Sequence, residues 1–143
     1  MASLGGDIGD YTITKIKSQA HFDEQKKRFA GIKAVKEGSI KLEEMTPEAK
    51  TELANITQQV NTYKPQINRL YTVQSMMMDM YGSLEIEIII EDNSSIVAVN
   101  FIESDGSFFT ESFLQEAQQM IMKWKIKVKK AIIYSFRMKF QKL

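Results

Sequence analysis

The chain has 143 residues, 43% of them hydrophobic and 26% charged, with a formal net charge of +1 and no cysteine. These values are typical of one globular domain that folds alone, and they exclude a disulfide scaffold, a thiolate zinc site, wholesale disorder and a fibrous repeat. No apolar run approaches the roughly 20 residues that span a bilayer, and no secretory signal is visible, so we expect a cytoplasmic or otherwise intracellular protein without a transmembrane segment.

The first residues are predicted to form an arm outside the domain. Residues 1–17 contain three closely spaced glycines, which favour a flexible or extended chain. Within them, residues 11–16 alternate polar and apolar side chains, as a short strand does. The domain is expected to occupy residues 18–143 and to begin with a helix over about Gln19–Glu37, which Ser18 caps.

A second helix is predicted to begin at Pro47. Thr46 supplies a capping hydroxyl, Pro47 occupies the first helical position, where no N–H is needed, and Glu48 suits the positive end of the helix dipole. Apolar residues then recur at spacings of three and four, which is the pattern of a heptad seam for helix packing. The seam residues are Ala49, Leu53, Ile56, Val60, Tyr63, Ile67 and Leu70.

Proline inside this seam is expected to distort the helix. The ring of Pro65 displaces a backbone hydrogen bond, but the seam keeps its register on both sides. We therefore expect a kinked pair of helical segments, over about 47–63 and 66–80, that ends at Gly82.

The segment from about residue 84 to residue 103 is predicted to form an antiparallel hairpin. Apolar side chains occupy alternate positions on both sides of the turn signal Asp92-Asn93-Ser94, which indicates two strands with one buried face. A second turn signal, Asp105-Gly106, leaves room for an extra short strand at 107–109.

Two patterns compete in the C-terminal third. Thr110 and the apolar residues that follow it predict an amphipathic helix to about residue 130, uninterrupted by any turn residue. Strict alternation of polar and apolar residues over 123–129, and again after residue 131, is instead a strand pattern. The sequence therefore does not decide the secondary structure of the last dozen residues. These elements together predict an α+β domain with three main helices and a small antiparallel sheet.

Opposite charges are segregated along the second half of the chain. No Lys or Arg occurs from Leu70 to Met122, and no acidic residue occurs from Ala117 to Leu143. Such asymmetry directs encounters with partners more strongly than net charge does. The candidate acidic patch consists of Glu85, Glu87, Glu91 and Asp92. The candidate basic patch, within the basic segment 123–143, consists of Lys123, Lys125, Lys127, Lys129, Lys130, Arg137 and Lys139.

Residue types that support catalysis or metal binding are sparse. His21 is the single histidine, and no serine lies in a nucleophile elbow. Asp7 and Asp10 lack the spacing of a calcium loop. Glu85 and Glu87 alternate with apolar residues, which indicates the solvent side of a strand and not a catalytic carboxylate pair. We expect no enzymatic activity, no cofactor and no metal site.

Two functions remain as hypotheses. The first is a structural or assembly subunit of a homo- or hetero-oligomer, such as a virion or phage particle, that uses the seam and the charged patches for subunit contacts. The alternative is a nucleic-acid-binding accessory protein whose lysines contact phosphates while Trp124, Tyr134, Phe136 and Phe140 stack on bases. A cluster of four methionines at 76–80 is either part of a partner groove or a helix end packed under the sheet.

Overall fold

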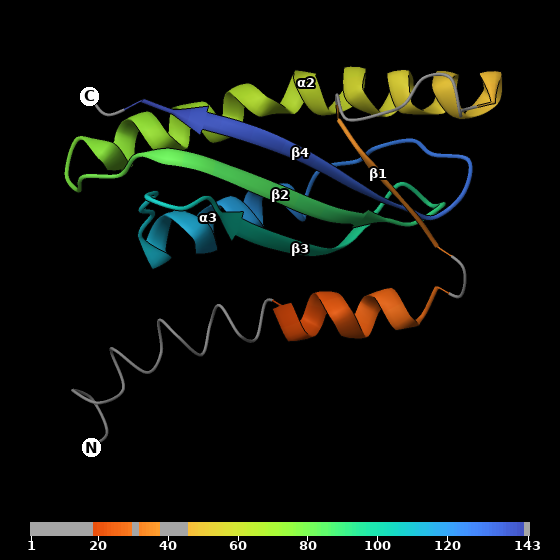
Figure 1. The fold of residues 1–143 in the computed structure, drawn as a ribbon, viewed down its shortest axis with the longest axis horizontal. Helices are drawn as coiled ribbons and strands as arrows, with labels where there is room; N and C mark the ends of the chain where they lie inside the picture. Colours follow the sequence, from red (N-terminus) through yellow and green to blue (C-terminus); the bar gives the residue numbers. More distant parts are fainter. Residues whose placement is uncertain (1–18, 30–31, 38–45, 142–143) are drawn as a thin grey trace.

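A mixed four-stranded sheet forms the centre of the fold (Figure 1). The computed structural model describes residues 19–29, 32–37 and 46–141. The strands are β1 (Lys33–Lys36), β2 (Gly82–Ile90), β3 (Ile96–Glu103) and β4 (Ile132–Phe140), in the spatial order β1-β4-β2-β3. β2 is antiparallel to both of its neighbours, whereas β1 is parallel to β4. The predicted α+β class is confirmed. The predicted arm lies outside the described residues.

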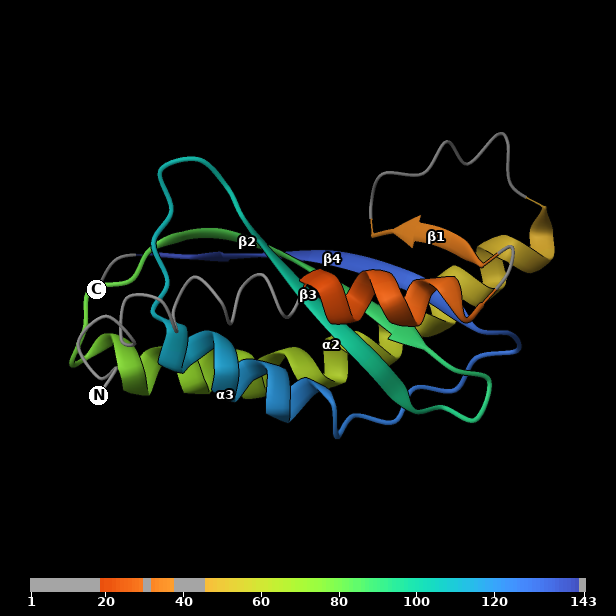
Figure 2. The same ribbon diagram turned by 90° about the horizontal axis from the view of Figure 1, so that it is seen from below.

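Helices cover both faces of this sheet. The helices α2 (Pro47–Ser75) and α3 (Glu111–Ile121) lie side by side on one face (Figure 2), where Ile56 and Phe113 join Ile86 and Ile88 in the main core. Helical residues 19–27 pack on the opposite face. Phe22 anchors them there, in a smaller cluster with apolar side chains of β2, β3 and β4.

The first helix is shorter than its sequence predicts. Helical geometry ends at residue 27, and the second half of the predicted helix over Gln19–Glu37 contains β1 instead. β1 pairs along its whole length with β4, from Lys33 opposite Ile132 to Lys36 opposite Ser135. The pairing partner is nearly a hundred residues away in the chain, so tertiary contact overrides the local helical pattern.

The second helix begins as predicted and continues through its proline. Thr46 is the N-cap, and its Oγ1 accepts a hydrogen bond from the backbone N–H of Ala49 at 3.1 Å. The predicted division at Pro65 and the extension to residue 80 are wrong, because α2 is one helix that ends at Ser75. Both Pro65 and Asn61, whose carbonyl the ring displaces, are exposed, so water can satisfy that carbonyl. Gly82 begins β2 and does not cap the helix.

The heptad seam is covered by its own chain. Ile56, Val60 and Ile67 are fully buried, and Leu53, Tyr63 and Leu70 are partly buried against the same core. The seam therefore holds α2 on the sheet. An apolar stripe of this spacing serves helix-to-sheet packing as well as it serves a coiled coil.

The predicted hairpin is confirmed as β2 and β3. Its turn is closed by the Glu91 N–H, which donates to the Ser95 carbonyl at 2.8 Å, and Ser94 adopts a positive φ of 76°. The extra strand expected at 107–109 is reduced to one bridge, between Tyr81 and Phe108.

The C-terminal third divides into helix, loop and strand. Thr110 caps α3, but the predicted continuation to about residue 130 is wrong, because α3 ends at Ile121 and residues 122–131 form a loop. β4 then enters the centre of the sheet between β1 and β2. The alternation over residues 123–129 reflects a loop that buries Trp124 and Ile126 and exposes the lysines between them.

Candidate interaction surfaces

Apolar side chains are exposed where α2 ends. Val73 lies in the last turn of α2, Met76 is the C-cap, and Met77 and Met78 follow in the turn after the helix. Their exposed fractions are 63%, 74%, 87% and 55%, respectively. By contrast, Met80 is buried and accepts a hydrogen bond from the Thr110 hydroxyl. We call Val73, Met76, Met77 and Met78 the methionine end. These three methionines are not packed under the sheet.

Acidic groups accompany the methionine end. Asp79 follows Met78 directly and is exposed. Glu116 of α3 accepts a hydrogen bond from Gln74, which lies between Val73 and Met76 in the chain. The last turn of α2 contains no basic residue to offset its negative dipole end. The nearest cation before this region in the chain is Arg69, one helical turn before Val73.

A hollow of about 630 Å³ lies near the opposite end of α2. Apolar side chains of the first strand, of α2 and of the start of β4 form its walls, among them Val35, Leu53 and Ile132. Lys33, Lys129 and Lys130 also line it, as do Glu48 and Glu52. The Oε1 atom of Glu52 is buried and has no hydrogen-bond partner within the described part of the chain. No motif in the sequence identified this hollow, because its walls come from three distant segments.

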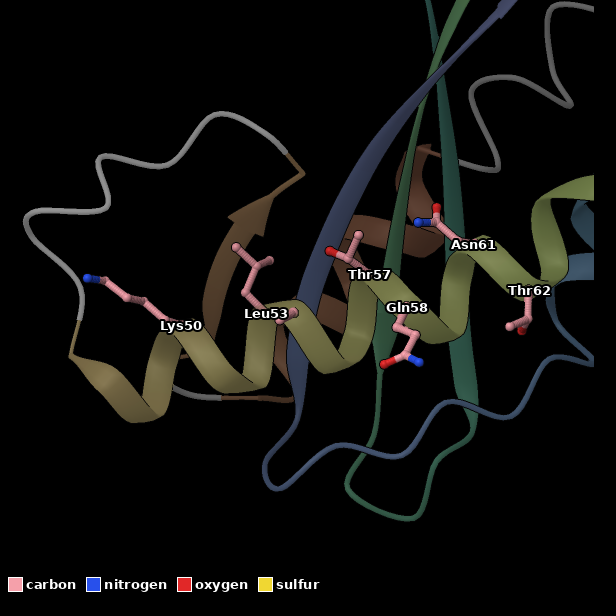
Figure 3. Close-up of a pocket in the computed structure, with 7 residues that line it drawn as sticks. Lys50, Leu53, Thr57, Gln58, Asn61 and Thr62 are labelled. Atoms are coloured by element: carbon pink, nitrogen blue, oxygen red, sulfur yellow. The ribbon is translucent and has the colours of Figure 1, made fainter.

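A second, shallower groove of similar volume follows one side of α2 (Figure 3). Its described lining consists entirely of α2 residues, from Lys50 to Thr62. Thr57 in this groove also reaches the sheet, where its hydroxyl and that of Tyr134 form a hydrogen bond of 2.9 Å. The groove therefore lies above the contact that joins α2 to β4.

The lysines of the candidate basic patch divide between a loop and a strand. Lys123, Lys125, Lys127, Lys129 and Lys130 are exposed on residues 122–131, which we call the lysine loop. Gln59 of α2 fixes this loop: its side chain donates to the Lys127 carbonyl at 3.0 Å and accepts from the Lys127 N–H at 2.8 Å. Arg137 and Lys139 lie apart from these residues, on β4.

The aromatic residues of the same segment are unavailable for stacking on bases. Trp124, Tyr134, Phe136 and Phe140 are all buried in the core. Trp124 stacks instead on Tyr63, with ring centroids 4.9 Å apart. The stacking mechanism expected for the nucleic-acid hypothesis therefore has no exposed aromatic platform in this segment.

The candidate acidic patch is dispersed and partly neutralised. Glu85 lies within salt-bridge distance of Lys36 and of Arg137, its partner on β4. Glu87 accepts a hydrogen bond from Asn100 at 2.9 Å. Both carboxylates are half-buried, so the sequence prediction of a solvated face is only partly met.

The hairpin turn, in contrast, lies beside the lysine loop. Glu91 pairs with Arg28 at 3.7 Å. The Lys125 ammonium is 3.2 Å from the Ser95 hydroxyl, and the Ile126 N–H donates to the Ser94 carbonyl. The turn of the acidic block and the lysine loop of the basic block therefore lie against each other within one molecule.

Comparison with known protein families, with curated proteins and with solved structures gives no match to this chain. None of the helices in the described ranges combines the length and apolar composition needed to cross a membrane. Within the same ranges, no three His, Asp or Glu side chains come together as a metal site would require.

A polar cluster joins α2 to the sheet next to the hollow. The Tyr134 hydroxyl lies 3.3 Å from a Glu37 carboxylate oxygen, and the Lys64 ammonium donates to the same carboxylate at 2.9 Å. Burial raises the pKa of Tyr134 to about 12, and the charge of Glu37 adds to this rise, against the hydrogen bond from Thr57. Tyr134 is therefore a neutral hydrogen-bonding group and not an activated base.

The raised pKa of Tyr134 predicts a loss of stability at alkaline pH. The folded protein keeps the phenol proton that the unfolded chain releases near pH 10, so this contribution is complete below pH 10 and is lost as the pH rises to about 12. A rise of this size corresponds to a contribution of at most about 3 kcal/mol. We expect Tyr134→Phe to remove this part of the alkaline decline, measured by urea unfolding at several pH values.

Comparing the wild type with Tyr134→Phe also removes the contribution of other ionisable groups to the alkaline decline. Burial and Asp79 raise the pKa of Tyr71, which titrates equally in both proteins and cancels in the difference. An alkaline decline of the same size in the wild type and in Tyr134→Phe would contradict the prediction.

Proposed function

We propose that this protein is a non-catalytic assembly subunit that binds other protein molecules through its methionine end. The observation that supports this proposal is the exposure of four apolar side chains within six residues of the chain, Val73, Met76, Met77 and Met78. Clusters of exposed apolar side chains often mark protein–protein interaction sites, and methionine adapts to partner surfaces because its side chain is flexible and polarizable. The residues proposed for contact thus differ from the seam that the sequence suggested, since that seam packs on its own sheet.

The proposal predicts self-association that depends on the methionine end. Covering a Val or Met side chain contributes about 1.5–3 kcal/mol, so Met76→Gln/Met77→Gln is expected to weaken association by at least about tenfold. Both residues are exposed, so the fold should tolerate the change. Sedimentation velocity between about 1 and 300 μM, a range that spans micromolar affinities, measures the effect.

Met122→Gln provides a matched control, because Met122 is an exposed methionine on another part of the surface. It should associate as the wild type does. A wild-type protein that stays monomeric over the whole concentration range would contradict assembly through copies of this chain.

The exposed lysines favour one alternative, a nucleic-acid-binding accessory protein. Five cations on one fixed loop can contact phosphates without any aromatic stacking. This function predicts that Lys125→Gln/Lys127→Gln/Lys129→Gln weakens binding to DNA or RNA and flattens its dependence on salt. Failure of the wild type to bind either polymer at low salt in a fluorescence-anisotropy titration would eliminate this alternative.

A further inference from the structure

We propose that the methionine end of one molecule docks into the hollow of a second copy, so that subunits assemble head to tail. This inference rests on the proposed assembly function and adds to it the identity of the partner surface. It follows from three observations: the two surfaces lie at opposite ends of the molecule, they match in polarity, and the dipole of α2 runs from one to the other.

The positions of the two surfaces permit a repeating contact. Thr46 and Ala49, at the start of α2, line the hollow, and Met76 and Met77 follow its end. The 29 residues of α2 separate these surfaces by about 43 Å. Figure 1 shows α2 running along the long axis of the molecule, so one molecule can use both surfaces at once without a clash between its neighbours.

The two surfaces are also complementary in chemistry. The methionine end projects apolar side chains and is followed by the carboxylate of Asp79. The hollow has apolar walls, and Lys33, Lys129 and Lys130 line it. Its volume of about 630 Å³ lies within the range of binding pockets in proteins. Lysine side chains can cover methionines with their methylene stems while their ammonium groups reach the carboxylate.

Two acidic residues of the hollow act against this contact. Glu48 and Glu52 oppose an incoming carboxylate, but the lining lysines outnumber them. The N-terminus of α2 lies at the hollow and carries a positive partial charge, whereas its C-terminus lies at the methionine end. Head-to-tail contact therefore aligns the α2 dipoles of successive copies. The buried Oε1 atom of Glu52 is an acceptor to which a docked chain can donate.

A contact between two different surfaces leads to a ring or a filament and not to a closed dimer. The contact can therefore be tested by mixing two variants that each lack one of the two surfaces. The first variant, Met76→Gln/Met77→Gln, loses the projecting surface and keeps the hollow. The second, Lys129→Glu/Lys130→Glu, repels Asp79 at the hollow and keeps the methionine end. Both are compared with the wild type by sedimentation velocity after nuclease treatment, with circular dichroism to verify folding.

We expect the wild type to form species larger than dimers as its concentration rises. Each variant alone should associate at least about tenfold more weakly. An equimolar mixture should form dimers and nothing larger, because one good contact remains per pair. Lys26→Glu/Lys27→Glu reverses the same number of exposed charges on the N-terminal helix and should assemble as the wild type does.

The other outcomes separate the two proposals. If Lys129→Glu/Lys130→Glu assembles normally while Met76→Gln/Met77→Gln does not, the methionine ends of two copies meet each other: the head-to-tail contact is then wrong and the assembly function stands. A mixture of the two variants that stays monomeric also overturns the head-to-tail contact. A monomeric wild type overturns the head-to-tail contact and contradicts any assembly through copies of this chain.

Discussion

Trp124→Ala is expected to lower the free energy of unfolding by about 3–5 kcal/mol, the range found when a large buried aromatic side chain is removed. Trp124 is only 2% exposed although it belongs to a loop. Its ring stacks on Tyr63 of α2 and lies 6.3 Å from Phe136 of β4, between centroids. Its loss leaves a cavity between helix and sheet and removes one of the contacts that hold the lysine loop on α2. Urea unfolding followed by circular dichroism measures the change.

Trp124→Phe separates the two contributions of this side chain. Phenylalanine retains an aromatic ring in the stack but cannot replace the indole N–H, which donates to the Gln66 side-chain oxygen at 3.0 Å. That hydrogen bond contributes about 1 kcal/mol, and the smaller ring adds a modest packing loss. Trp124→Phe should therefore be clearly more stable than Trp124→Ala. Equal stabilities of the two variants would show that the ring stack contributes nothing.

Gly82→Ala is expected to destabilise the fold by about 2–6 kcal/mol, from two additive causes. Gly82 has a φ of +115°, which costs an L-residue about 1–3 kcal/mol. A Cβ atom at this position would lie 2.0 Å from the Ser107 hydroxyl, and relieving such overpacking costs a further 1–3 kcal/mol or so. The shift would also disturb the hydrogen bond from the Ser83 N–H to that hydroxyl.

Gly106→Ala is the matched control for this substitution. Gly106 also has a positive φ, of +79°, but apart from its two chain neighbours no described residue has an atom within 4 Å of the position of its Cβ. Only the backbone strain then remains, and a loss of about 1 kcal/mol is expected. Thermal unfolding of the two variants compares them directly. Similar losses for both would mean that the contact with Ser107 is relieved at no cost.

Elements specified by nearby residues could be predicted from the sequence. The start of α2 depends on Thr46 and Pro47, and the hairpin depends on alternation around Asp92-Asn93-Ser94, so local chemistry decides both. β1 could not be predicted in the same way, and the strand alternation of β4 competed with a helical pattern. Each is stabilised by its partner in the sheet, and the segment around Val35 has no local property that excludes a helix.

The candidate surfaces were less predictable than the fold. The spacing of Ile56, Val60 and Ile67 is the same whether the facing surface is a sheet or another helix, so the sequence could not reveal that the seam is internal. Likewise, the run of methionines did not indicate which of them face solvent. The difference between Met77 and Met80 arises from where α2 ends, which the sequence placed five residues too late.

The position of Trp124 has a practical consequence for separating folding from association. It is the single tryptophan of the chain, and its indole is buried against Tyr63, which joins it to α2. Its intrinsic fluorescence emission therefore reports whether this helix is seated on the sheet, without any introduced label. Changes at Met76 or Lys130 that alter particle size yet leave the emission spectrum unchanged can be assigned to contacts between molecules.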